Sequence, residues 1–82
     1  MICTYETRII AACPMDGGPD VYEATFTSDD TIKCEAILEA IAPYAVEKAF
    51  QEQITADLAR KLRCTVKTVG FHSGVKTTVI AP

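Results

Sequence analysis

The chain has a single histidine, His72, and none of its four cysteines is spaced as Cys-x2-Cys. A zinc site of the usual ligands would have to be assembled from distant positions, so we expect no metal site. No apolar run is long enough to cross a membrane, and the first residues lack the charged segment and apolar run of a secretory leader. The sequence predicts a cytoplasmic protein whose thiols are reduced.

Basic residues are also few. The net charge is -3, and the eight Lys and Arg are scattered apart from Arg60, Lys61 and Arg63. This distribution gives no electrostatic footprint for a phosphate backbone, which excludes unspecific binding to DNA or RNA.

Apolar residues, in contrast, are abundant in the 82-residue chain. They make up 49% of it, whereas charged residues make up 23%, and no repeat, linker or low-complexity segment interrupts it. Such a composition excludes a disordered chain and predicts a single domain spanning 1–82. Because a domain of this size buries a modest part of its surface, we expect it to form a homo-oligomer.

The hydrophobic pattern changes period along the chain. Alternating runs predict strands, runs with helical spacing predict helices, and Pro43 favours the first turn of a new helix. The predicted elements are strands at 2–13 and 21–28, helices at 32–41 and 44–62, and strands at 64–71 and 75–80. This ββααββ order is typical of an α+β domain, an antiparallel four-stranded sheet with two helices on one face.

The turn between the first two strands reads Cys13-Pro14-Met15-Asp16-Gly17-Gly18-Pro19-Asp20. Pro and Gly restrict the backbone of such a turn, so Cys13 and Asp20 would be held in place at its two ends. The two side chains could act as a nucleophile and a proton donor. The simpler interpretation of these residues alone is a plain hairpin loop with an inert, buried cysteine.

The ββααββ order and the motif Cys-Pro-x-x-Gly-x-Pro-Asp resemble the tunnelling fold and, within it, the QueF family of 7-cyano-7-deazaguanine reductases and their relatives. The resemblance spans most of the chain. Five fixed positions of the family motif agree, namely Cys13, Pro14, Gly17, Pro19 and Asp20. Met15 and Asp16 stand where the family has Val and Thr.

The resemblance implies roles for individual residues. Cys13 would attack the nitrile carbon of the deazapurine to form a thioimide, and Asp20 would give the nitrile nitrogen its proton. Glu35 matches the family's Glu in the first helix, and Phe50-Gln51-Glu52 matches its Phe-His-Glu segment. Glu35 and Glu52 would then bind the guanine-like edge, since a carboxylate can accept two hydrogen bonds from it.

Three features depart from the reductases. Gln51 replaces the family's His, and we expect His72 to substitute for it only through subunit contacts. No basic residue follows Glu35 at 36–41, so we expect no NADPH and no other cofactor. The chain is also short, which resembles the QueF-like branch, in which an amine opens the thioimide to give an amidine.

The sequence therefore predicts an oligomeric QueF-like enzyme of the queuosine and archaeosine pathways, with sites between subunits. Its substrate would be 7-cyano-7-deazaguanine or a related purine or pterin, free or within a nucleic acid. Cys13 and Asp20 would be catalytic, and Glu35, Gln51, Glu52 and His72 would bind substrate. Two alternatives stay open: a pterin-pathway enzyme of the same fold, and a non-catalytic binding or assembly module, which Gln51 favours.

Overall fold

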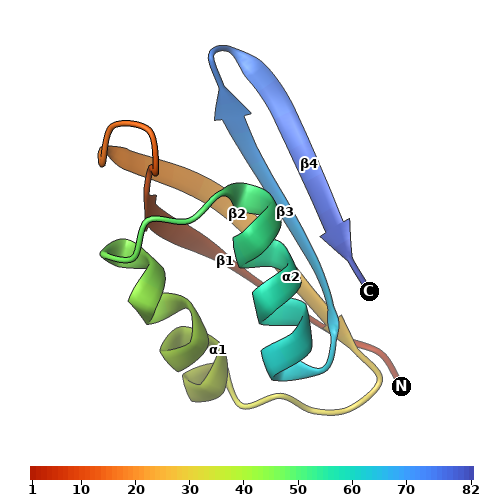
Figure 1. Cartoon of the computed structure of the whole chain (residues 1–82). Helices are drawn as coiled ribbons and strands as arrows, with labels where there is room; N and C mark the ends of the chain where they lie inside the picture. Colours follow the sequence, from red (N-terminus) through yellow and green to blue (C-terminus); the bar gives the residue numbers. More distant parts are fainter.

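The computed structural model describes all residues, 1–82, and confirms the ββααββ order (Figure 1). Its elements are β1 (Cys3–Ala12), β2 (Pro19–Ser28), α1 (Cys34–Ile41), a 3-10 helix η1 (Ala42–Ala45), α2 (Gln51–Leu62), β3 (Thr65–His72) and β4 (Val75–Ala81). The strands form one sheet in the order β1-β2-β3-β4, and every neighbouring pair is antiparallel. Both helices lie on one face of this sheet.

The core lies between the sheet and the helices. Strand alternation turns Tyr22, Ala24 and Phe26 of β2 inward, where each is at most 2% exposed. Ile54 and Leu58 of α2 meet them from the helix layer and are fully buried. Burial of each large side chain of this kind contributes about 1.5 to 3 kcal/mol, so this layer contact is a main source of stability.

The second helix is shorter than the predicted span of 44–62. Pro43 begins only the single 3-10 turn Ala42–Ala45, the chain is then non-helical through Phe50, and α2 starts at Gln51. Phe50 is extended (φ -74°, ψ 156°), and its N–H donates to Oε1 of Gln53 at 3.0 Å, which caps the helix. The apolar residues spaced four apart placed the start of this helix too early. Val46, the first of them, is 80% exposed and is not part of the core.

The opposite face of the sheet carries no helix. Ile10, Val21, Phe71 and Ile80 are exposed there, and β1 and β4 each have one unpaired edge. The homo-oligomer expected from the composition stays a prediction. No helix combines the length and the apolar character that a membrane crossing requires.

Candidate active site

The turn that carries Cys13 is fixed by its own backbone. The N–H of Cys13 donates to the carbonyl oxygen of Gly18 at 2.8 Å, and the N–H of Gly17 donates to that of Cys13 at 2.7 Å. The carboxylate of Asp16 accepts from the N–H of Gly18 at 2.8 Å, and Gly17 has a φ of +77° that favours glycine. These hydrogen bonds fix the backbone at Cys13, whose side chain is half-buried.

Asp20 and Tyr22 lie two residues apart on β2, so their side chains share the face that the helices cover. The hydroxyl of Tyr22 donates to Oδ2 of Asp20 at 3.3 Å. Burial of the phenol and, secondarily, the neighbouring carboxylate of Asp20 raise the pKa of Tyr22 to about 12. Tyr22 is thus a neutral donor to Asp20 at physiological pH.

Gln51, the first residue of α2, is buried in a hydrogen-bond network. Its Nε2 donates to the carbonyl oxygen and the hydroxyl of Thr68 at 3.2 and 3.1 Å, and to the carbonyl oxygen of Thr77 at 3.1 Å. Thr55 completes the network through bonds of 2.7 Å to the carbonyl oxygen of Gln51 and to the hydroxyl of Thr68. The network ties α2 to β3 and β4.

His72 reaches this network within the same chain, so the expectation that it would do so only through subunit contacts is wrong. Its Nε2 lies 2.8 Å from Oε1 of Gln51. β3 extends through residue 72, and its alternation puts His72 on the same face as the buried Thr68 and Gly70. The imidazole also lies near the ring of Tyr22, with 6.0 Å between the centroids.

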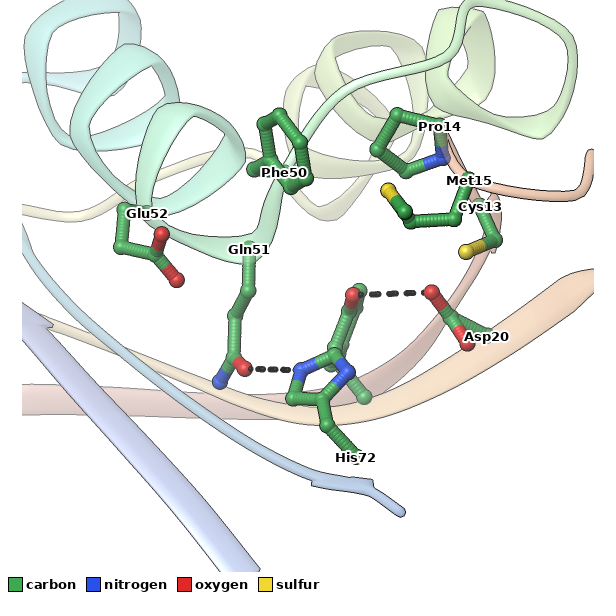
Figure 2. A pocket seen from close by; sticks show the side chains of 9 residues that line it. Cys13, Pro14, Met15, Asp20, Phe50, Gln51, Glu52 and His72 are labelled. Atoms are coloured by element: carbon green, nitrogen blue, oxygen red, sulfur yellow. Dashed lines mark hydrogen bonds between the residues drawn. The ribbon is translucent and has the colours of Figure 1, made fainter.

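These side chains surround one cavity of about 240 Å³ (Figure 2). Its lining consists of Cys13, Pro14, Met15, Asp20, Tyr22, Phe50, Gln51, Glu52 and His72. Two carboxylates and no Lys or Arg line it, so the cavity suits a ligand that offers N–H donors rather than an anionic one. The apolar side chains of Met15 and Phe50 flank these polar groups.

Glu35 does not line the cavity. It is exposed in the first turn of α1, and α1 starts at the end of the helix layer opposite to the Cys13 turn (Figure 1). Of the six predicted site residues, the fold thus brings together Cys13, Asp20, Gln51, Glu52 and His72. No group of three or more His, Cys, Asp or Glu side chains is arranged to hold a metal ion.

Tyr22 was not among the predicted site residues. The sequence does contain a signal for it, because residues i and i+2 of a strand share a face. The predicted strand 21–28 left Asp20 in the turn, whereas β2 of the structure begins at Pro19 and so places Asp20 and Tyr22 on one strand face. Periodicity does not indicate Phe50, because its place depends on where α2 begins; only the match of Phe50-Gln51-Glu52 to the family's Phe-His-Glu segment points to it.

No family model matches the chain, and no curated protein matches it in sequence. Among solved structures, the chain is similar to the archaeosine synthase QueF-Like in its apo form, with a TM-score of 0.88. The alignment covers 98% of this chain and 90% of that chain, at 19% sequence identity. The two proteins share the QueF-like tunnelling fold, which confirms the predicted architecture.

Proposed function

We propose that this chain, which has the QueF-like tunnelling fold, is an enzyme whose Cys13 attacks the nitrile of 7-cyano-7-deazaguanine or a closely related ring. The observation that carries the proposal is a single cavity that holds Cys13, Asp20 and Glu52 together. The fold supports it, since the similar solved structure is an archaeosine synthase. The product of the attack is a covalent thioimide.

The first step needs a proton acceptor and then a proton donor. Asp20 takes the thiol proton while the sulfur of Cys13 bonds to the nitrile carbon, and the same proton passes from Asp20 to the nitrile nitrogen. No atom is gained or lost beyond the addition of the thiol across the triple bond. The hydroxyl of Tyr22 donates to this carboxylate, which fixes the position of Asp20 for both proton transfers.

Glu52 supplies the anchor for the ring. It is exposed in the first turn of α2 and lines the cavity, where its carboxylate can accept two hydrogen bonds from the N–H groups of a guanine-like edge. The N-terminal end of α2 favours that negative charge. Glu35 can reach such a cavity only from a second copy of the chain, and its role as a further anchor stays a prediction.

The cavity favours an amine over NADPH as the second reactant. A dinucleotide phosphate needs cationic or backbone donors, and no Lys or Arg lines this cavity. A primary amine needs only a path to the thioimide carbon and an acceptor for its proton. We therefore propose amidine formation as the complete reaction.

The imidazole of His72 beside Gln51 argues against the alternative of a non-catalytic module. That alternative was favoured by Gln51, which stands where the family has a histidine. His72 lies at hydrogen-bond distance from Gln51, so the cavity contains an imidazole after all. This arrangement supports catalysis.

Intact-protein mass spectrometry after incubation with 7-cyano-7-deazaguanine tests the proposal. We expect the wild type to gain the mass of one nitrile molecule and Cys13→Ala to gain none. Cys34→Ala is the matched control, because Cys34 is exposed and lies outside the cavity. A folded wild type without adduct, or an adduct retained in Cys13→Ala, would show that the proposal is wrong.

A further inference from the structure

We propose that His72 is a second acid/base group of this site, held by Gln51 as the Nε2–H tautomer, and that its Nδ1 accepts the proton of the amine that attacks the thioimide. This inference rests on the proposed function. It assigns one proton transfer to Asp20 and a different one to His72.

The orientation of the Gln51 amide follows from its partners. The carbonyl oxygens of Thr68 and Thr77 can only accept hydrogen bonds, so the group that faces both must be the amide nitrogen. Oε1 of Gln51 is then the atom that faces His72. Because this oxygen can only accept, Nε2 of His72 must donate to it across the 2.8 Å contact.

A neutral imidazole that donates through Nε2 has its lone pair on Nδ1. Nδ1 of His72 has no hydrogen-bond partner in the chain, whereas every fully buried side-chain nitrogen and oxygen has one. Nδ1 is therefore solvent-accessible, and His72 lines the cavity. Figure 2 shows this nitrogen on the side of the ring away from Gln51.

Other cavity groups are already engaged. The carboxylate of Asp20 accepts from Tyr22 and serves the thiol of Cys13, and the hydroxyl of Tyr22 stays protonated because its pKa is raised to about 12. Glu52 is assigned to the ring edge. Nδ1 of His72 is the remaining acceptor that the chain holds in a fixed direction.

The second step balances with a primary amine as the co-reactant. The amine nitrogen bonds to the thioimide carbon, and one of its protons passes to Nδ1 of His72. The tetrahedral intermediate then expels the sulfur of Cys13, and the imidazolium returns the proton to that sulfur. The products are the amidine and the free thiol.

Nitrogen-15 NMR tests the orientation without any reaction. His72 is the single histidine of the chain, so its two ring nitrogens need no assignment among others. At a mildly alkaline pH we expect the neutral ring to be the Nε2–H tautomer. A predominant Nδ1–H tautomer would overturn the inference.

Release of the thioimide by glycinamide, followed by mass spectrometry, tests the chemical role. In His72→Ala we expect the adduct to form but its release to slow by about 10²- to 10⁴-fold, and we expect added imidazole to restore part of the rate. Lys76→Gln, on β4 and outside the cavity, is the control and should release as the wild type does.

The outcomes separate the two proposals. An adduct that His72→Ala releases at the wild-type rate overturns the role of His72 and leaves the thioimide proposal standing. A slowed release that imidazole does not restore would indicate a structural role and would also overturn it. A wild type that forms no adduct overturns both proposals.

Discussion

The ring of Tyr22 occupies the space that a side chain at Gly70 would fill. A Cβ at residue 70 would lie 2.5 Å from Cδ1 and 2.7 Å from Cε1 of that ring, closer than real Cβ atoms come to other atoms. Tyr22 is 1% exposed, so its ring has little room to move aside. The missing side chain on β3 thus lets the hydroxyl of Tyr22 reach Asp20.

Gly70→Ala should therefore disturb both stability and the site. We expect a loss of about 1 to 3 kcal/mol in the free energy of unfolding, measured with urea, and slower adduct formation as Tyr22 is displaced. Gly74→Ala is the matched control, because nothing lies within 4 Å of its Cβ position and only its φ of +82° is unfavourable. Gly74→Ala should lower the free energy of unfolding by about 1 kcal/mol and leave the rate of adduct formation unchanged. Equal adduct rates in all three proteins would contradict the expectation.

Tyr22→Phe should change the pH dependence of stability. The pKa of Tyr22 is raised from 10.0 to about 12 in the folded protein, so the folded state holds the phenol proton more tightly than the unfolded state. Its contribution is complete below about pH 10 and is lost as the pH rises towards about 12. Urea unfolding across this range should show a smaller decline in Tyr22→Phe than in the wild type. Parallel curves would mean that burial and Asp20 do not perturb this phenol.

Gln51→Ala should destabilise the fold more than the loss of one polar side chain usually does. It removes the hydrogen bonds that Nε2 donates to Thr68 and Thr77 and takes a buried side chain out of the core, so we expect a loss of about 2 to 4 kcal/mol in the free energy of unfolding. Gln53→Ala lies two residues along the same helix and loses only the cap on Phe50, at a cost of about 1 kcal/mol. Thermal and urea unfolding of both variants provide the comparison. Similar losses of stability in Gln51→Ala and Gln53→Ala would contradict this expectation, because the buried network would then contribute no more than the exposed cap.

Cys64 should be the slowest of the four thiols to react with iodoacetamide. Its side chain is buried, and burial raises its pKa, so both access and the thiolate fraction are low. Cys34 is exposed and serves as the reference. Peptide mapping should show Cys64 alkylated late in the native protein and at the rate of Cys34 in urea. Early modification of Cys64 under native conditions would indicate that the C-terminal end of α2 opens readily.

The strands were the most predictable part of this protein, for a physical reason. Alternation places Tyr22, Ala24 and Phe26 on one face, and that face is the one the helices bury. The turn Ser73-Gly74 likewise contains two residues with positive φ, as a tight hairpin requires. Such signals are local, so no knowledge of the remaining chain is needed to use them.

The start of α2 and the place of His72 were not predictable in the same way. The segment before Gln51 has helical spacing, yet its conformation depends on the 3-10 turn at Pro43 and on the cap from Gln53. The prediction ended β3 one residue too early and so left His72 in a loop. Its contact with Gln51 joins two elements, and no pattern within either element reveals it.

The two ends of the cavity come from separate hairpins. The first hairpin supplies Cys13 from its turn and Asp20 from β2, and the second supplies His72 at the end of β3. Only five residue pairs, Glu23↔Val69 to Thr27↔Thr65, join β2 to β3. Each hairpin closes a short loop and can form early, whereas the β2–β3 pairing must close the long loop that contains both helices. Release of the captured nitrile by an amine needs Cys13 from the first hairpin and His72 from the second, so in a refolding chain it would report the slow, long-range step of folding rather than hairpin formation.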